Sequence, residues 1–285
     1  MQAIKNPPYI WLISGCSSGF GRELALKALS MGDFVGVSSR KIEDVEDICN
    51  QYPETSVAIT LDVTKKQDIN QSIETITKTF GGLDVLVNNA GYGYLAAIEE
   101  GEDEEVRRLF ETNFFGALEL TKAALPGMRS QKFGRIINNS SQAGIMANPG
   151  TGYYSSSKFA LEGLMEALDK ELRPLNIAVT SVQPGAFRTD WSGRSMKRSK
   201  NEISDYQEHV KERIDMISAI DGKQPGDPLR AAKIIFELSR NLNPPNKLLL
   251  GAGVLQTYKE KLKELNAQID EFEKITLSAD FPKTD

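Results

Sequence analysis

The chain has 285 residues, of which 40% are hydrophobic and 26% are charged, a balance typical of a soluble globular protein and not of a disordered or fibrous one. Its formal net charge is -5 and its Lys and Arg residues are scattered, so we expect no nucleic-acid partner. The two cysteines, Cys16 and Cys49, are too few for a disulfide framework or a four-thiolate zinc site, which indicates a reduced, cytoplasmic setting and no metal. The apolar run near the N-terminus is too short for a signal peptide or a membrane span, so we expect no membrane association.

Short β-branched segments alternate with longer segments of helical periodicity. In chain order, the predicted strands and helices are 9–14 and 20–30, 34–39 and 42–52, 56–61 and 66–80, 85–90 and 106–129, 134–140 and 154–173, 178–184 and 229–240, and a last strand at 247–251. This alternation predicts a parallel sheet wrapped by helices, and the nearly continuous apolar strands predict that both faces are covered. We expect one α/β domain over residues 1–285, a doubly wound parallel sheet (Rossmann fold) of about seven strands with helices on both faces.

Two segments depart from this pattern. About forty residues, 186–227, separate a predicted strand from the next helix, and we interpret them as a lid over the carboxyl edge of the sheet. The alternative is a surface insertion that only packs on the body. Residues 255–275 are rich in Lys, Glu and Leu at helical spacing, which predicts a closing helix or a subunit contact, or simply a solvated helix with i,i+4 ion pairs.

A glycine-rich turn follows the first predicted strand and leads into the first predicted helix. It reads Gly-Cys-Ser-Ser-Gly-Phe-Gly over residues 15–21. A strand, a glycine turn and a helix N-terminus together present backbone N–H groups and the positive end of the helix dipole to a pyrophosphate. The cofactor contacts expected from this turn are Gly15, Ser17, Ser18, Gly19, Phe20 and Gly21.

The same turn also fits the G-x-S-x-G pattern of serine hydrolases, with Ser17 as the nucleophile. A hydrolase would need a later acidic residue followed by a histidine. The single histidine of the sequence, His209, lies in the charged insertion without a recognisable strand end before it. The dinucleotide-binding interpretation is therefore favoured.

The end of the second predicted strand is where a doubly wound fold meets the adenosine ribose, with a carboxylate for a 2′-hydroxyl or a cation for a 2′-phosphate. Residues 38–41 read Ser-Ser-Arg-Lys and offer no carboxylate, whereas the guanidinium of Arg40 suits a phosphate. We therefore predict NADP(H) in preference to NAD(H), with Ser39 and Arg40 as contacts. Alternatively, Arg40 is only a solvated cation, and Ser18 stands where some NADP-dependent enzymes have a second basic residue.

Tyr154 and Lys158 lie four residues apart near the start of the predicted helix 154–173. Because residues at this spacing share one helical face, we expect the Lys158 ammonium close to the Tyr154 phenol. A nearby positive charge lowers a phenol pKa from about 10 toward the working pH, as general acid–base catalysis requires. Tyr153 has Ser157 at the same spacing, which favours Tyr154 as the acid–base residue.

The fifth predicted strand ends beside Ser140 and Ser141, at the edge where open α/β sheets place their ligands. A serine hydroxyl there can hydrogen-bond a substrate oxygen as charge develops on it. The two serines point to opposite faces, so only one can serve.

These motifs together resemble the short-chain dehydrogenase/reductase family. The resemblance covers about residues 9–189 and is carried by Gly15-x-x-x-Gly19-x-Gly21, Asp62-Val63, Asn88-Asn89-Ala90-Gly91, Asn113, Ser141, Tyr154-x-x-x-Lys158 and Pro184-Gly185. It implies an oxidoreductase whose Tyr154 gives a proton to a carbonyl in reduction and takes it back in oxidation. Lys158 would lower the tyrosine pKa and hold the nicotinamide ribose, Ser141 would stabilise the substrate oxygen, and Asn113 would support a proton relay through water.

The resemblance also implies cofactor contacts beyond the glycine turn, from Tyr154 and Lys158 and from the following residues. They are Asp62 and Val63 at the adenine, Asn89, Ala90 and Gly91 beside the adenosine ribose, and Pro184, Gly185, Phe187 and Thr189 at the nicotinamide and pyrophosphate. The plainer alternatives are that Asn88 and Asn89 tie strands together and that Asp62 caps a turn.

The C-terminal part differs from many family members, which finish with a glycine-rich strand and a short tail that helps to build a tetramer. Here residues 247–251 read Lys-Leu-Leu-Leu-Gly and a charged helix follows, so that tetramer is in doubt and a homodimer or another homo-oligomer is left open. This ending and the insertion look more like the branch that includes 17β-hydroxysteroid-dehydrogenase-like reductases, which does not identify a steroid as substrate.

The expected walls of the substrate pocket are mainly apolar and aromatic, although such side chains could equally be core. They are residues 92–95, residues 142–145, Asn148, Phe187 and Trp191. We therefore expect a hydrophobic ketone, aldehyde or secondary alcohol as substrate. The alternative from another class is a non-catalytic NADP(H) sensor or scaffold, which would have no reason to retain Asn113, Ser141, Tyr154 and Lys158 together.

Overall fold

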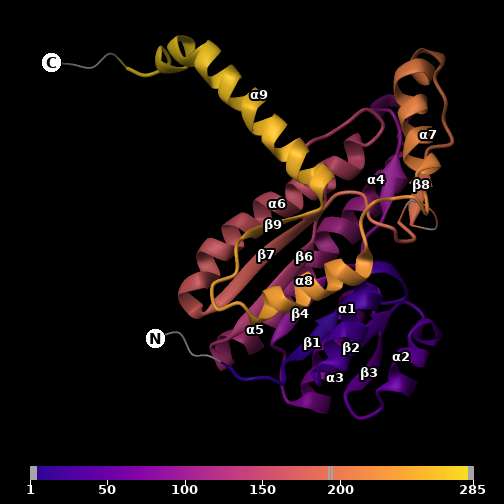
Figure 1. The fold of residues 1–285 in the computed structure, drawn as a ribbon, viewed down its shortest axis with the longest axis vertical. Coiled ribbons are helices and arrows are strands. Elements are labelled where there is room, and N and C mark those ends of the chain that lie inside the picture. Colours follow the sequence, from indigo (N-terminus) through magenta and orange to yellow (C-terminus); the bar gives the residue numbers. More distant parts are fainter. Residues whose placement is uncertain (1–4, 192, 194, 282–285) are drawn as a thin grey trace.

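The computed structural model describes residues 5–191, 193 and 195–281. Its centre is a seven-stranded parallel sheet with the strand order β3-β2-β1-β4-β6-β7-β9 (Figure 1). The strands are β1 (Ile10–Ile13), β2 (Phe34–Ser39), β3 (Ser56–Thr60), β4 (Val85–Asn88), β6 (Gly134–Asn139), β7 (Ile177–Pro184) and β9 (Lys247–Leu250). The predicted single-domain, doubly wound parallel sheet is confirmed.

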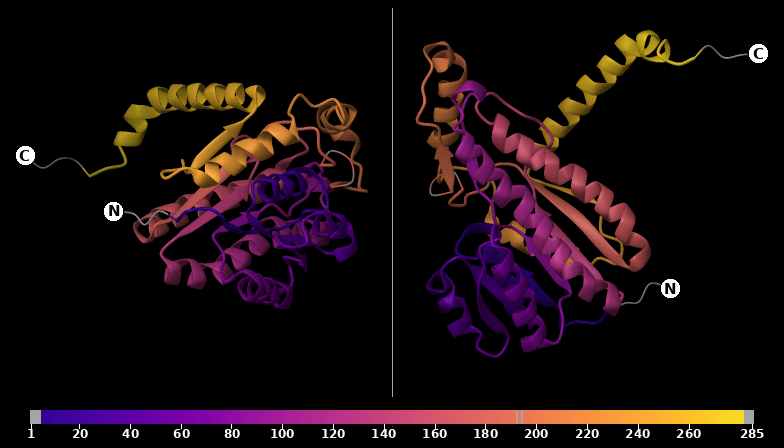
Figure 2. Two further views of the ribbon diagram at one scale, coloured as in Figure 1. Left: turned by 60° about the horizontal axis from the view of Figure 1, so that its bottom comes forward. Right: turned by 180° about the vertical axis from the view of Figure 1, so that it is seen from behind.

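Helices cover both faces of this sheet (Figure 2). On one face lie α1 (Gly19–Ser30), α2 (Glu46–Gln51) and α8 (Pro228–Arg240), and on the other lie α3 (Lys66–Phe80), α5 (Ala117–Gln131) and α6 (Gly152–Leu172). The side chains of β1 alternate between the two cores, with Trp11 and Ile13 in one and Ile10 and Leu12 in the other. Two covered faces explain why the strands are almost continuously apolar.

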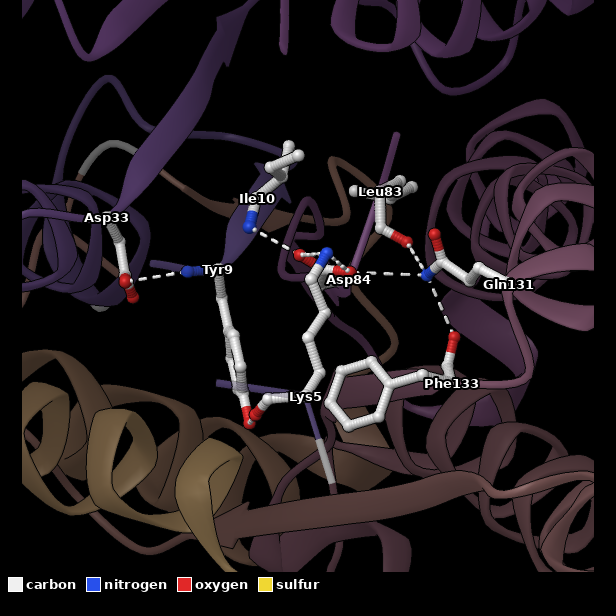
Figure 3. Close-up of polar contacts among 8 residues, drawn as sticks. All are labelled: Lys5, Tyr9, Ile10, Asp33, Leu83, Asp84, Gln131 and Phe133. Carbon is white, nitrogen blue, oxygen red and sulfur yellow. Dashed lines mark hydrogen bonds and ion pairs between the residues drawn. The ribbon is translucent and has the colours of Figure 1, made fainter. Parts of the chain in front are cut away.

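Two buried carboxylates hold the amino end of β1 (Figure 3). Asp84 accepts a hydrogen bond from the backbone N–H of Ile10 at 2.9 Å and from the ammonium of Lys5 at 2.6 Å. Asp33 accepts one from the backbone N–H of Tyr9 at 2.9 Å. Since charged acceptors make the stronger hydrogen bonds, these contacts fix the central strand whose other end carries the glycine turn.

The strand order reverses at β1, which lies between β2 and β4. In open α/β sheets ligands bind at such a point, outside the carboxyl ends of the strands. Here the carboxyl ends of β1 and β4 lead into residues 15–21 and 89–91, both predicted to contact the cofactor. The topology therefore brings two distant segments of the chain to one place.

Some helical segments are more broken than the sequence predicts. The helix expected at 106–129 consists of α4 (Asp103–Phe110), the π-helical segment η3 (Glu111–Gly116) and α5. The segment expected at 42–52 is the 3-10 turn η1 (Ile42–Asp44) followed by the short α2. Further 3-10 turns are η2 (Ile98–Glu100), η4 (Gln142–Gly144) and η5 (Arg173–Leu175). Apolar periodicity over a long window does not resolve such single-turn changes.

The insertion at 186–227 has secondary structure of its own, including β8 (Met196–Arg198), the 3-10 turn η6 (Ser204–Tyr206), the π-helical segment η7 (Gln207–Lys211) and α7 (Glu212–Ala219). β8 pairs in parallel with β5 (Gly93–Leu95), forming a separate two-stranded sheet that the sequence did not predict. Val210 and Ile214 pack with Leu95 and Ala97. These contacts attach the insertion to the segment that follows β4. Figure 1 labels β8 and α7, the strand and helix of the insertion.

The last helix, α9 (Ala252–Leu277), has 26 residues and is longer than the predicted 255–275. Its first turn packs on the body, where Val254 is fully buried, and the rest projects away from it (Figures 1 and 2). Within the described part of the chain, no helix combines the length and apolar character needed to cross a membrane.

Candidate active site

The glycine turn joins the carboxyl end of β1 to the first turn of α1. Gly15 and Gly19 have φ values of +75° and +58°, which residues with side chains rarely adopt. A Cβ at Gly21 would lie 2.3 Å from the carbonyl oxygen of Gly15, and one at Gly19 would lie 3.3 Å from Thr189. Only glycines fit these positions, and they let the start of α1 approach an anionic group closely, as a pyrophosphate cradle requires.

Asn89 fastens the glycine turn to the end of β4. Its side-chain amide donates to the carbonyl oxygens of Ser14 and Gly15, each at 2.9 Å, and its oxygen accepts from the amide of Asn139 at 2.9 Å. The hydroxyl of Ser14 accepts from the backbone N–H groups of Asn89 and Ala90. These contacts support the structural alternative for Asn89, and its ribose contact stays a prediction.

The structure brings three predicted catalytic side chains together where β6 ends and α6 begins. Tyr154 is only 5% exposed, and the side chain of Ser141 lies near enough to its phenol to lower the phenol pKa. The Lys158 ammonium, one helical turn further on, lies 5.8 Å from the centre of the Tyr154 ring and donates to the carbonyl oxygen of Asn139 at 2.7 Å. Of the two candidate serines, Ser141 is therefore the one beside the tyrosine.

The direction of the tyrosine pKa shift differs from the expectation. Burial raises the pKa of Tyr154 to about 12. Hydrogen bonding by Ser141 acts in the opposite direction but is the smaller effect. Burial also lowers the pKa of Lys158 to about 8, against the nearby Glu162 carboxylate, which raises it. The expected lowering of the Tyr154 pKa below 10 by Lys158 is therefore not found: burial, which disfavours the charged phenolate, dominates the shift, and the group that opposes it is Ser141.

Asn113 lies in the π-helical segment η3 and is 2% exposed. Its side-chain oxygen accepts from the backbone N–H of Tyr92 at 3.0 Å, and its amide donates to the Tyr92 carbonyl at 2.9 Å and to the Ser157 hydroxyl at 3.2 Å. A Cβ at Gly91 would lie 3.1 Å from the Asn113 oxygen and 3.8 Å from the Lys158 nitrogen. Asn113 therefore borders the same site. Short π-helical segments such as η3 are often found at functional sites.

A family model described as short chain dehydrogenase matches residues 10–200. The chain belongs to the short-chain dehydrogenase family. A 3-ketodihydrosphingosine reductase of Bacteroides thetaiotaomicron is 37% identical over 256 residues, which cover 89% of this chain and 85% of that protein. An NADPH-dependent 3-dehydrocapnine reductase of Ornithobacterium rhinotracheale is 36% identical over 190 residues, which cover 65% of this chain and 67% of that protein.

A solved short-chain dehydrogenase from Streptomyces avermitilis is similar in structure, with a TM-score of 0.90 and 37% identity over 96% of this chain and all of that one. Other similar solved structures hold NADP, NAD or NADH. This short-chain dehydrogenase is therefore an oxidoreductase with a nucleotide-binding Rossmann fold, and the family excludes the serine hydrolase alternative. Its His209 lies exposed in η7 of the insertion, not at a strand end.

At the adenosine end of this short-chain dehydrogenase, the structure corrects one expectation. A carboxylate does lie near the end of β2, because η1 folds Asp44 back until its oxygen is 3.3 Å from the Ser39 hydroxyl. The sequence window 38–41 missed it, since Asp44 follows five residues after Ser39. Arg40 is exposed at the same strand end. Both kinds of ribose recognition thus have a candidate residue, and the preference for NADP(H) stays a prediction.

The pair after β3 has structural roles in the described contacts. Asp62 accepts hydrogen bonds from the backbone N–H and the hydroxyl of Thr64, at 3.1 Å and 2.7 Å, so it caps a turn as in the plainer alternative. Val63 packs against Gly116, where a Cβ would lie 2.6 Å from it. Their contacts with an adenine stay predictions.

The segment after β7 covers the glycine turn. Gly185 donates to the carbonyl oxygen of Leu250 at 3.0 Å, which fixes the path of the chain after Pro184. The ring of Phe187 packs edge-on against Phe20 of α1, with 5.0 Å between the ring centres. Thr189 lies against Gly19, as described above. Of the predicted cofactor residues in this segment, Phe187 and Thr189 are thus adjacent to the cradle.

The insertion supplies an aromatic wall for the site. The indole of Trp191 lies 5.3 Å from the Tyr154 ring, centre to centre. A Cβ at Gly93 would meet Met196 at 2.7 Å and Trp191 at 3.0 Å. The sequence predicted Trp191 as a wall but not Met196, which lies with it at Gly93 because β8 pairs with β5.

Other predicted pocket walls turn out to be core or structural. Tyr94 is fully buried in a cluster with Leu109 of α4, and Leu95 packs against the insertion. The side chain of Gln142 donates to the hydroxyl of Thr257 at 3.0 Å and so ties the catalytic turn to α9. Among the described residues, no group of three or more His, Cys, Asp and Glu side chains could hold a metal ion, and no catalytic role above requires one.

Proposed function

We propose that this enzyme transfers a hydride between NADP(H) and a hydrophobic carbonyl or secondary alcohol, with Tyr154 as the general acid in reduction. The observation that carries the proposal is the buried phenol of Tyr154, with Ser141 near enough to lower its pKa, Lys158 one helical turn away and the glycine cradle close by. Bound NADP(H) would supply or accept the hydride. The residues of the chain would bind the substrate oxygen and move the proton.

The raised pKa of Tyr154 supports the reductive direction. A phenol whose pKa is about 12 keeps its proton at neutral pH, as a general acid must. In our proposal Ser141 and Tyr154 both hydrogen-bond the carbonyl oxygen, and the phenol proton passes to that oxygen as negative charge develops on it. The Lys158 ammonium stabilises the tyrosinate that is left, and Asn113 holds the backbone at Tyr92 beside it.

The chemistry of the wall around Tyr154 supports an apolar substrate. Trp191 and Met196 present an indole and a thioether above Gly93, with no charged group in these contacts. Two relatives are named as a 3-ketodihydrosphingosine reductase and a 3-dehydrocapnine reductase. We therefore propose a ketone on a long or bulky apolar chain as the substrate class.

Arg40 and a relative named as NADPH-dependent support NADP(H), whereas Asp44 near Ser39 is the residue that could favour NAD(H). The test compares kcat/KM for NADPH and NADH in the wild type, Arg40→Ala and Asp44→Asn. We expect Arg40→Ala to lower kcat/KM for NADPH by about tenfold or more and to leave that for NADH nearly unchanged. If instead Asp44→Asn lowers kcat/KM for NADH and neither variant changes kcat/KM for NADPH, the proposed cofactor is rejected.

The mechanism is tested with two neighbouring tyrosines. Tyr154→Phe removes the proton donor, and we expect kcat for an apolar ketone to fall by about 10² to 10⁴ while NADPH still binds. Tyr153→Phe is the matched control, because the Tyr153 hydroxyl donates to the carbonyl oxygen of Ile98 instead. Activity that persists unchanged in Tyr154→Phe would reject the proposal.

A further inference from the structure

An apolar seam runs along the part of α9 that leaves the body. Its side chains alternate at spacings of three and four residues and are Leu255, Tyr258, Leu262, Leu265, Ile269 and Phe272. Tyr258 is half-buried, and the other five are 41% to 64% exposed. From residue 262 to residue 277 every residue of the helix is exposed. A monomer rarely exposes such a continuous apolar surface unless something binds it.

The spacing of the seam indicates what kind of surface covers it. Apolar residues every three and four positions place one narrow stripe along a helix, and two such stripes pack by knobs-into-holes contacts. A helix that packs on a sheet or a globular body usually has a broader apolar face. The seam therefore fits a single partner helix.

The charges of α9 indicate that the partner helix is another α9 in the opposite direction. Residues 255–264 carry three lysines and two glutamates, a net charge of +1, whereas residues 265–277 carry one lysine, one aspartate and two glutamates, a net charge of -2. Antiparallel pairing sets the basic half of each helix against the acidic half of the other, while parallel pairing would set like against like. Opposed helix dipoles add to this preference.

We propose that two copies of this chain associate through antiparallel pairing of their α9 helices. One register pairs every residue of the seam with a seam residue of the second copy: Leu262 faces Leu265, Tyr258 faces Ile269, and Leu255 faces Phe272. Lys259 follows Tyr258 and Glu273 follows Phe272, so both charged side chains lie on the same side of the seam. In this register Lys259 of each copy lies near Glu273 of the other, which gives two such pairs related by the two-fold axis. The catalytic bodies lie at opposite ends of the helix pair.

A membrane surface is the other partner that an amphipathic helix could bind. Such helices carry a polar face rich in Lys and Arg, which anionic lipid attracts. The polar positions of α9 mix both signs and sum to a net negative charge. This composition favours protein over lipid as the partner.

The first test measures the mass of the full-length protein by analytical ultracentrifugation over a range of concentrations. The double variant Leu262→Glu with Leu265→Glu should raise the dissociation constant by about 100-fold or more, because it places four carboxylates in the centre of the seam. Ala267→Glu, on the side of the helix away from the seam, is the control and should change it by about twofold or less. An assembly mass that the double variant leaves unchanged would overturn the proposal.

The second test reports direction. Asn266 follows Leu265 and lies beside the two-fold axis, so only antiparallel pairing brings residue 266 of one copy next to residue 266 of the other. In a Cys49→Ser background, where the remaining Cys16 is buried, Asn266→Cys should oxidise to a covalent dimer and Ala267→Cys should not. Equal cross-linking of the two variants, or none in either, would overturn antiparallel pairing.

Charge reversal and vesicles complete the test. Lys259→Glu and Glu273→Lys should each raise the dissociation constant by roughly tenfold, and the double reversal should restore it. Failure of the double reversal to restore association would reject this register. Binding of a monomeric protein to vesicles of phosphatidylcholine and phosphatidylserine, lost in Leu262→Glu with Leu265→Glu, would replace a second copy by a lipid surface.

Discussion

Replacing Gly21 by alanine tests the glycine cradle directly. The added Cβ would lie 2.3 Å from the carbonyl oxygen of Gly15 and 2.5 Å from the side-chain nitrogen of Asn89. Carbon atoms approach non-bonded heavy atoms to about 3.5 Å, so Gly21 must move away from Gly15 and Asn89 by roughly 1 Å. The Asn89 side chain cannot simply rotate away, because it holds the turn through its hydrogen bonds to Ser14 and Gly15.

The magnitude follows from these contacts. Overpacking of this kind costs about 1–3 kcal/mol, and each hydrogen bond of Asn89 that breaks adds about 1 kcal/mol. We therefore expect Gly21→Ala to lower the free energy of unfolding by about 2–4 kcal/mol. Because the shifted atoms line the cradle, we also expect the Kd for NADPH to rise by about tenfold or more.

Urea unfolding followed by tryptophan fluorescence measures the first effect, and titration of NADPH fluorescence measures the second. The matched control is Gly163→Ala on the exposed side of α6, where a Cβ meets nothing within 4 Å. That change should stabilise the protein by about 0.5–1 kcal/mol, since alanine is the better helix former, and should leave NADPH binding as it is. If Gly21→Ala unfolds and binds NADPH like the wild type, the cradle is not formed as described.

Three further predictions concern charge and packing. Since burial lowers the pKa of Lys158 to about 8 and raises that of Tyr154 to about 12, kcat/KM for reduction should fall above pH 8 as the ammonium loses its proton while the phenol keeps its own. A profile that stays flat to pH 10 would contradict this sign. Trp191→Ala should lower kcat/KM for an apolar ketone by about tenfold and leave the Kd for NADPH unchanged, as steady-state kinetics and titration can check. Asp84→Ala should lower the free energy of unfolding by about 1–3 kcal/mol, because it leaves the buried N–H of Ile10 without its acceptor. Urea unfolding that shows a loss below about 0.5 kcal/mol would contradict a role for this network in stability.

Much of the fold could be predicted because its signals are local. Each strand of the large sheet is a short apolar run between turn residues, and each is found where that pattern occurs. The cap of α8 is equally readable, since Asp227 accepts from the backbone N–H of Leu229 just before the helix. By contrast, β5 and β8 are three-residue strands that pair with each other across about a hundred residues, and neither segment carries a local signal that identifies its partner.

The candidate site divides in the same way. The four-residue step from Tyr154 to Lys158 places both on one face of a helix whatever surrounds it. The position of Asp44 beside Ser39 depends on a 3-10 turn, which a reading of the strand end alone did not include. Met196 comes to lie at Gly93, beside Trp191, through a strand pairing across about a hundred residues of chain. Residues brought in by long-range contacts were the ones missed.

By itself, the sequence determined the order of strands and helices, the glycine turn at the switch point and the pairing of a tyrosine with a lysine, because short-range periodicity and backbone geometry suffice for each. Tertiary structure alone decided how deeply that pair is buried, and thus that the phenol holds its proton more tightly than in water, not less. It also decided that Trp191 stands over the tyrosine and that α9 extends from the body with its apolar seam exposed. Burial and distance are properties of the whole packed chain, and desolvation can reverse the effect that a neighbouring charge alone would have.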